Sequence, residues 1–347
     1  MKSILFLYSE MMPYMERVIL SMKNDFGCSI KVVSWKKNKL TPYVPKFPDS
    51  IESFNREDFK ENKDLFKLIN DFSPDLIYVS GRMDKLYLEV VKSFKRQIPI
   101  VMGCDAQLKK SLKQIVQKAL NYFLYHQYFT HIWIPGYRQY AFARYINFKD
   151  DQIIGNLYSG NSRLYSSMKK NNSNLKRVLF VGRLEKTKNI DILIDAWQSI
   201  AKSIKKGWIL TLIGDGKLKS KAKNIEDIEL TGFISQKEME LYITEPSIFC
   251  LPSRKEPWGV VVHEFSAAGL PLLLTRKVGA SDDFLIDGYN GFLINKCDKA
   301  SIKEGLIKLI SKEDAVLNKM GIRSKELSSK ISPKISAASL ISILKDK

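Results

Sequence analysis

Short apolar runs alternate with longer amphipathic stretches along the whole chain. In the first half, runs of strand length occupy residues 4–8, 30–34, 76–80, 98–103 and 132–135. Between them, apolar residues recur every three or four positions at 16–24, 61–71 and 85–95, which is typical of amphipathic helices. This alternation of strands and helices predicts a parallel sheet that is covered by helices on both faces.

The second half of the chain repeats the alternation more clearly. Its apolar runs of strand length occupy residues 178–181, 209–213, 228–231, 248–251, 272–274 and 291–294. Several of them end in Gly, Pro or Ser, as strands do where they enter a tight turn before a helix. The pattern therefore predicts a second parallel α/β domain.

A polar stretch rich in Ser, Asn and Lys separates the two halves and is typical of a linker. We expect an N-terminal α/β domain over 1–160, a linker over 161–175 and a C-terminal α/β domain over 176–331. Residues 332–347 read as one more helix after a proline break, which we expect to pack back on the N-terminal domain. Two domains suit 347 residues, because one hydrophobic core rarely serves so long a chain.

The charge balance indicates an anionic partner. The chain has 56 Lys and Arg against 37 Asp and Glu, a net charge of +19. Such a charge favours nucleic acid, an acidic membrane leaflet or a phosphorylated substrate, and does not separate these three. The sequence has no zinc-finger, RNP or helix-turn-helix spacing, so we do not expect a nucleic-acid partner.

The four cysteines indicate a reducing compartment. They are widely spaced without a C-x-x-C pair, and most lie in or beside apolar runs, as buried thiols do. The apolar run near the N-terminus is short and reads as a first strand rather than a signal peptide. No stretch approaches the length that spans a bilayer. We therefore expect a cytoplasmic protein.

The most informative segment follows the apolar run at 248–251. That run ends at Ser253, a short turn carries Glu256, and a helix is expected to begin near Gly259. Amides at a helix start suit an anionic phosphate or a sugar hydroxyl, here those of Gly259, Val260 and Val261. Glu264 lies beyond the first turn, within reach of a ribose diol. Taken singly, Glu256 could be a carboxylate favoured by the helix dipole, and Glu264 could lie on a solvated helix face.

Taken together, the two glutamates resemble a known motif. Glu256 and Glu264 match the E-x7-E motif of the retaining glycosyltransferases of family 4, which have the GT-B fold. Further segments between Val178 and Ile294 resemble this family in order and spacing, at 181–184, 188–191, 213–216, 231–234, 251–253 and 287–292. The resemblance implies two Rossmann-like parallel-sheet domains that face a central cleft. It also implies sugar transfer from a nucleotide diphosphate, with retention of anomeric configuration.

The resemblance assigns roles to donor-binding residues. Arg183 and Lys188 would hold the diphosphate as catalytic cations, with Glu256 beside the sugar ring and Glu264 on the ribose. The other expected donor contacts are Gly182, Ser253, Gly259, Val260 and Val261, with Phe233 and Ile234 at the base. Phe233 could equally be a core residue. The chain has no Asp-x-Asp pair, so we expect no metal and no cofactor.

The acceptor half matches the family less well. The N-terminal domain binds the acceptor in this family, often through a glycine-rich turn and a His-Asp pair. Residues 9–14 (Ser-Glu-Met-Met-Pro-Tyr) replace that turn, and Gly103-Cys104-Asp105 replaces the pair. Asp105 and Met12 remain as candidate acceptor contacts, with a structural helix cap as the alternative for Asp105.

A basic and aromatic segment suggests a further partner. Residues 101–170 contain ten Lys and Arg against three Asp. Lys109, Lys110, Lys113 and Lys118 share one helical pattern, and aromatic residues follow it. An anionic membrane surface is one interpretation, which implies a protein that is peripheral on the inner face of the membrane and a lipid-linked acceptor. The alternative is a helix with a core stripe and a solvated lysine face.

The resemblance leaves the substrates open. UDP and GDP both remain donors, and a saccharide or a lipid-linked saccharide remains the acceptor. We expect a role in bacterial surface polysaccharide or glycolipid synthesis. Two hypotheses compete with this one: a GT-B epimerase or phosphorylase, and an inactive binding subunit. The presence of the four charged residues Arg183, Lys188, Glu256 and Glu264 argues against the inactive subunit.

Overall fold

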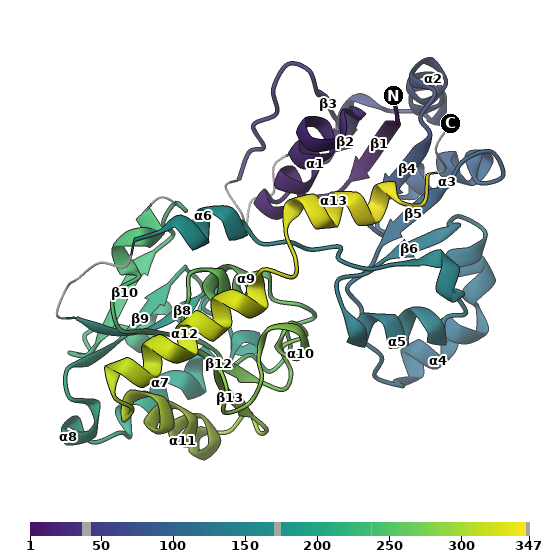
Figure 1. Ribbon diagram of the computed structural model, residues 1–347. Coiled ribbons are helices and arrows are strands. Elements are labelled where there is room, and N and C mark those ends of the chain that lie inside the picture. The colour runs from purple at the N-terminus through teal and green to yellow at the C-terminus, as the bar shows by residue number, and fades with distance from the viewer. Residues whose placement is uncertain (37–42, 170–174, 237, 345–347) are drawn as a thin grey trace. The chain divides into compact units, whose positions relative to one another are not determined.

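The computed structural model describes residues 1–36, 43–169, 175–236 and 238–344. The chain divides into two compact units (Figure 1). The N-terminal unit comprises Met1–Asn161 and Ile331–Lys347, and the C-terminal unit comprises Ser162–Lys330. Among the described residues, no helix is both long enough and apolar enough to cross a membrane.

The N-terminal unit contains a parallel sheet with strand order β3-β2-β1-β4-β5-β6-β7 among its described residues. Its strands are β1 (Ser3–Tyr8), β2 (Ser29–Ser34), β3 (Glu52–Asn55), β4 (Leu76–Val79), β5 (Ile100–Gly103), β6 (His131–Trp133) and β7 (Ile153–Ile154). Its helices are α1 (Pro13–Phe26), α2 (Asn62–Phe72), α3 (Lys85–Phe94), α4 (Leu112–Ala119), α5 (Tyr137–Tyr145) and α13 (Pro333–Ile341), with short turns η1 (Arg56–Asp58), η2 (Tyr122–His126) and η3 (Asp150–Gln152).

Both faces of this sheet are buried, as its continuous apolar strands predict. Leu5 and Leu7 of β1 point into one core, whereas Ile4 and Phe6 of the same strand point into the other. Helix α13 packs on α1 in the second core, and the Ser336 hydroxyl donates to the carbonyl of Asn156 at 2.5 Å. The last helix of the chain therefore belongs to the N-terminal unit.

The C-terminal unit contains a parallel sheet with strand order β10-β9-β8-β11-β12-β13. Its strands are β8 (Lys176–Val181), β9 (Trp208–Ile213), β10 (Ile228–Gly232), β11 (Ser247–Leu251), β12 (Leu272–Thr275) and β13 (Gly291–Ile294). Its helices are α6 (Ser162–Ser167), α7 (Ile190–Gln198), α8 (Lys202–Lys205), α9 (Val260–Ala267), α10 (Ser281–Phe284), α11 (Lys299–Ile310) and α12 (Asp314–Ser328), with short turns η4 (Lys186–Lys188), η5 (Lys219–Ala222) and η6 (Glu238–Tyr242).

The predicted strands and the parallel α/β class are confirmed in both units. Every strand predicted from an apolar run is present, with bounds within two residues of the expected ones. The edge strands β3 and β7 were not predicted.

The predicted linker over 161–175 differs from the structure. Residues 162–167 form helix α6, whose Tyr165 is buried against Phe265 at a ring-centroid distance of 5.6 Å. A single buried aromatic residue in a polar stretch gives no periodic pattern, so the sequence predicted a linker where helix α6 lies. Residues 170–174 of the predicted linker lie outside the described residues.

The strand order places a ligand-binding position in the C-terminal unit. The order reverses between β8 and β11, because β8 leads to β9 on one side and β11 continues on the other. Open parallel sheets bind ligands outside the carboxyl ends of their strands at such a switch point. Residues 182–188 follow β8 and residues 252–259 follow β11, so both segments lie at this point.

Candidate functional site

The loops after β8 and β9 lie backbone against backbone. The amide of Gly182 donates to the carbonyl of Ile213 at 3.0 Å, and that of Leu184 donates to the carbonyl of Asp215 at 2.9 Å. Gly214 has φ 130°, and a Cβ there would lie 2.1 Å from the Gly182 carbonyl oxygen. Only glycine fits this position, and the loop that carries Arg183 is thereby fixed.

The structure brings the candidate catalytic residues Lys188 and Glu256 together. Lys188 ends the turn η4 after β8, and its ammonium forms an ion pair with the carboxylate of Glu256, which follows β11. Both side chains are mostly buried. Arg183 lies five positions before Lys188 and is half exposed, and its guanidinium lies 3.3 Å from the carboxylate of Glu185.

The turn that carries Glu256 is held by backbone hydrogen bonds to the loop after β12. The amide of Gly279 donates to the carbonyl of Glu256 at 3.0 Å, and that of Ala280 donates to the carbonyl of Trp258 at 2.9 Å. The indole of Trp258 is buried against Phe284. Glu256 therefore sits on a fixed turn rather than on a solvated loop.

Gly259 joins this turn to helix α9. It has φ 99°, and a Cβ there would lie 3.1 Å from Cγ of Glu256. It is also the N-cap of α9, and it offers no side chain to the first amides of the helix. Val260 and Val261 form the first turn and are half-buried. The amides of this turn have no partners within the helix ladder, which suits an anion.

Glu264 is buried on α9, so the alternative of a solvated helix face is wrong. Its charge acts on Tyr165 of α6. Burial first, and then the negative charge of Glu264, raise the pKa of Tyr165 well above its usual value. Glu256 and Glu264 thus lie on either side of the α9 start, one in the turn and one on the helix.

Ser253 is fully buried, and its hydroxyl has no hydrogen-bond partner among the described residues. Its carbonyl accepts from the Thr275 hydroxyl at 2.6 Å, which ties the end of β11 to β12. An unpaired buried hydroxyl costs about 1–3 kcal/mol. A ligand oxygen at the strand end would satisfy it.

The expected base-contacting residues follow β10. Phe233 is exposed, so the alternative of a core residue is wrong, and Ile234 is half-buried. The amide of Gly214 donates to the carbonyl of Gly232 at 2.8 Å, which joins the β10 loop to the β9 loop. A continuous row of three loops therefore leads from Phe233 to Arg183.

Arg254 is a site residue that the sequence reasoning missed. Its Nε donates to Oδ1 of Asn189 at 2.6 Å, and its amide donates to the carbonyl of Thr187 at 2.9 Å. Asn189 is fully buried with φ 63°, and its side-chain Nδ2 donates to the carbonyl of Cys297 at 3.0 Å. Arg254 thus links the β11 loop to the turn that ends at Lys188. An Arg between Ser253 and Glu256 was the available signal.

Within the described ranges, no group of three or more His, Cys, Asp and Glu side chains is arranged to hold a metal ion. The positive charges at the C-terminal site include those of Arg183, Lys188 and Arg254.

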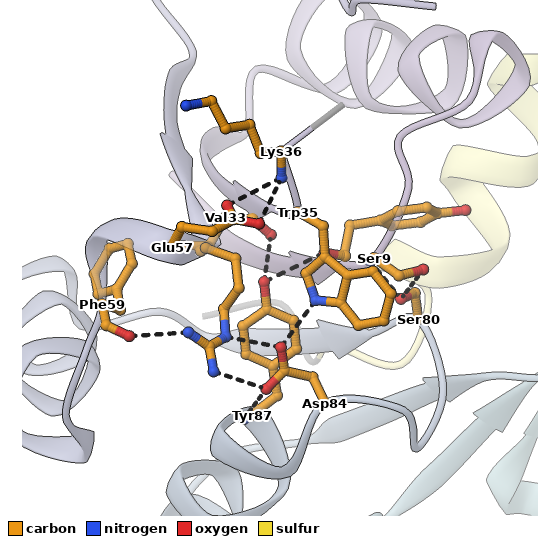
Figure 2. Close-up of polar contacts among 11 residues, drawn as sticks. Ser9, Val33, Trp35, Lys36, Glu57, Phe59, Ser80, Asp84 and Tyr87 are labelled. Carbon is orange, nitrogen blue, oxygen red and sulfur yellow. Dashed lines mark hydrogen bonds and ion pairs between the residues drawn. The ribbon is translucent and has the colours of Figure 1, made fainter. Parts of the chain in front are cut away.

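In the N-terminal unit, the loop that replaces the glycine-rich turn is anchored (Figure 2). The amide of Ser9 donates to the Ser80 hydroxyl at 2.8 Å, and the amide of Trp35 donates to the carbonyl of Ser9 at 2.9 Å. The carboxylate of Asp84 accepts from the Trp35 indole at 2.8 Å and from Nε of Arg56 at 2.7 Å. This satisfied network fixes the carboxyl ends of β1, β2 and β4.

The two acceptor candidates lie next to a tyrosine cluster. Met12 is the half-buried N-cap residue of α1 and precedes Tyr14 by two positions. Burial first, and then the charge of Asp105, raise the pKa of Tyr14 to about 12. Tyr14 and Tyr158 contact each other edge to face at 5.0 Å. Ser111 caps α4, so Asp105 is not the cap of that helix.

Comparisons with known proteins agree with this geometry. Residues 165–327 match the family described as Glycosyl transferases group 1. The chain is 38% identical over 160 residues to the uncharacterized glycosyltransferase MJ1178 of Methanocaldococcus jannaschii, covering 44% of this chain and 43% of that one. It is 28% identical over 143 residues to the capsular polysaccharide biosynthesis glycosyltransferase CapM of Staphylococcus aureus, covering 39% and 36%. The matches span less than half the length of these curated relatives.

A likeness to a solved structure covers both units. The crystal structure of Anabaena Alr3699/HepE in complex with UDP and glucose superimposes with a TM-score of 0.72 at 17% identity, covering 99% of this chain and 98% of that one. At this identity the likeness shows the fold, and it confirms the predicted class of two Rossmann-like parallel-sheet units.

Proposed function

Because this chain belongs to the group 1 glycosyl transferases through residues 165–327, we propose that it transfers a sugar from a nucleotide diphosphate to a hydroxyl acceptor. The observation that carries the proposal is the meeting of Lys188 and Glu256 at the switch point of the C-terminal sheet, beside the start of α9. A cation and a helix start can bind the phosphates, and a carboxylate can accept hydrogen bonds from the sugar hydroxyls.

In this proposal, the diphosphate binds Arg183, Lys188 and the first amides of α9. These groups stabilise the negative charge that develops on the leaving phosphate, which is where electrostatic catalysis contributes most. Arg183 is half exposed and available to a ligand, and Lys188 exchanges its pairing with Glu256 for the phosphate oxygens. Ser253 and Gly182 border the same loops.

The remaining donor contacts follow from the same geometry. Glu264 on α9 accepts hydrogen bonds from the ribose hydroxyls, and Phe233 and Ile234 contact the base. Glu256 contacts the sugar hydroxyls and stabilises positive character at the anomeric carbon. The HepE structure in complex with UDP and glucose supports UDP as the nucleotide and glucose as one sugar to test.

The proposed transfer proceeds with retention and without a protein nucleophile. The bond between the anomeric carbon and the phosphate oxygen breaks while the acceptor oxygen bonds to the same face of that carbon. The proton of the acceptor hydroxyl passes to the departing phosphate, so charge and atoms balance. The role of the protein is to position the reactants and to stabilise the leaving group.

We propose the N-terminal unit for the acceptor, a saccharide or a lipid-linked saccharide, with Met12 and Asp105 as contacts. The tyrosines around Asp105 offer the aromatic faces and hydroxyls that sugar rings use. The capsular polysaccharide role in the name of the CapM relative supports a setting in bacterial surface polysaccharide synthesis.

A thermal-shift panel with UDP, GDP and their sugars tests the donor half. A ligand at one hundred times its dissociation constant adds about 2.7 kcal/mol to the free energy of unfolding. For a unit of this size, that corresponds to an increase in Tm of roughly 5–10 °C. The proposal predicts this increase with one nucleotide family, and no increase with any nucleotide contradicts it.

A further inference from the structure

Helix α4 of the N-terminal unit carries its apolar side chains on the solvent side. Leu112, Ile115 and Val116 recur at helical spacing, and Leu120, Tyr122 and Phe123 continue the row into η2. These six side chains are between 44% and 82% exposed. We call them the α4 stripe. For α4 itself, the alternative of a core stripe with a solvated lysine face is therefore wrong, whereas the later aromatic residues Tyr125, Phe129 and Trp133 of this segment are buried in the core.

The inner side of α4 is polar. Gln114 is its buried side chain, with Oε1 accepting from the amide of Lys109 at 2.6 Å and Nε2 donating to the carbonyl of Gln107 at 2.7 Å. In Figure 1, α4 lies beside α5, and the ammonium of Lys118 lies over the Tyr145 ring of α5 at 4.8 Å. The helix is thus held by polar contacts, and its apolar side is left for another partner.

The chain segment that contains the stripe is basic. From Ala106 to Lys149 the sequence contains seven Lys and Arg and no Asp or Glu. Lys109, Lys110 and Lys113 are exposed beside the stripe. An apolar row flanked by lysines is the pattern of a helix that lies in the interface of an anionic bilayer, where lysine stems extend to the headgroups.

We propose that the α4 stripe docks this protein on an anionic lipid bilayer, with its aliphatic side chains at the acyl boundary and the three lysines on lipid phosphates. The docking goes beyond sugar transfer and does not depend on it. A second copy of the chain fits less well, because two like-charged faces would oppose each other. A nucleic acid fits less well, because four of the six side chains of the stripe are leucine, isoleucine or valine, which cannot stack on bases as aromatic rings do.

Vesicle flotation of the full chain tests the proposal. One set of vesicles is phosphatidylcholine, and the other mixes phosphatidylcholine with phosphatidylglycerol. We expect recovery with the anionic vesicles alone. Lys109→Gln/Lys113→Gln should reduce partitioning roughly 25-fold, at about 1 kcal/mol per lysine. Leu112→Gln/Ile115→Gln/Val116→Gln should reduce it at least as much, since both parts of the face contribute.

Control variants make the same kinds of substitution away from the stripe. Lys67→Gln/Lys319→Gln removes two exposed lysines elsewhere, and Val316→Gln/Ile322→Gln removes two exposed apolar side chains of α12. Both controls should float as the unaltered chain does. All variants should retain the far-ultraviolet circular dichroism spectrum, because the altered side chains face solvent.

Three results would overturn the proposal. The first is equal recovery of the protein with neutral and anionic vesicles, and the second is no recovery with either. The third is a dimer in light scattering that the triple variant abolishes, while no protein floats with vesicles. The nucleotide thermal shift, measured on the same samples, reports the donor site separately. Loss of flotation with an unchanged nucleotide shift is the expected behaviour of the stripe variants.

Discussion

The ion pair between Lys188 and Glu256 makes a quantitative prediction. The two side chains are 18% and 12% exposed, so neither charge is fully hydrated when its partner is removed. Loss of one partner from a buried pair costs about 3–5 kcal/mol. Because this pair keeps some contact with water, we expect about 2–3 kcal/mol for Lys188→Met or Glu256→Gln. The double variant should cost less than the sum, with a coupling of about 2 kcal/mol.

Urea denaturation of the full chain and its three variants measures this coupling. Tryptophan fluorescence follows the transition, because Trp197 and Trp258 are buried in the C-terminal unit. The same cycle with saturating UDP should show a smaller coupling, since Lys188 then binds phosphate. Additive costs within about 0.5 kcal/mol without nucleotide would refute the ion pair. An unchanged coupling with nucleotide would refute the exchange of partners.

Three further predictions test the site and the tyrosine cluster. Gly259→Ala should lower the free energy of unfolding by about 1–2 kcal/mol, because φ 99° is unfavourable for alanine. The added Cβ should also reduce kcat through its contact with Glu256, and an unchanged kcat in steady-state assays would contradict this. Arg254→Ala should lower the free energy of unfolding by about 1–3 kcal/mol, because Asn189 loses a hydrogen bond. It should also raise the KM for the nucleotide sugar more than it lowers kcat, whereas the exposed control Lys217→Ala should change neither constant. The pKa of Tyr14 is about 12 in the folded chain and about 10 in the unfolded chain, so the free energy of unfolding should fall as the pH rises from 10 to 12. Tyr14→Phe should make this fall shallower when urea midpoints are measured against pH. Parallel curves for the variant and the unaltered chain would contradict the prediction.

The strands were predictable because most are buried on both faces. The apolar runs at β1, β4, β8 and β11 are short and nearly continuous, which is typical of strands buried on both faces of a parallel sheet. The missed strand β3 is mostly exposed at a sheet edge, so its residues lack an apolar run. Strand β7 has two residues, which is too short for any pattern.

The candidate site was predictable in its residues but not in its contacts. The motif indicated Lys188 and Glu256 separately, and 68 positions separate them in the sequence. Their ion pair depends on β8 and β11 being neighbours, which local pattern does not reveal. The Arg254–Asn189 hydrogen bond depends on the same adjacency.

Helix α4 shows the limit of periodicity. The spacing of Leu112, Ile115 and Val116 predicts a helix with one apolar face. It does not tell whether that face is covered. The buried Gln114 settles the orientation, and only the three-dimensional structure places it inside.

Isothermal titration calorimetry with UDP on Glu264→Ala and Glu256→Ala tests the donor site most directly. A hydrogen bond to a charged group is worth about 1.5–3 kcal/mol, so Glu264→Ala should weaken UDP binding roughly 10- to 100-fold if Glu264 holds the ribose. Glu256→Ala should bind UDP at least as tightly as the unaltered chain does, because Lys188 no longer leaves an ion pair to reach the phosphates, and it should lose turnover with the UDP sugar. Equal UDP affinity in Glu264→Ala and the unaltered chain would contradict the assignment of this site.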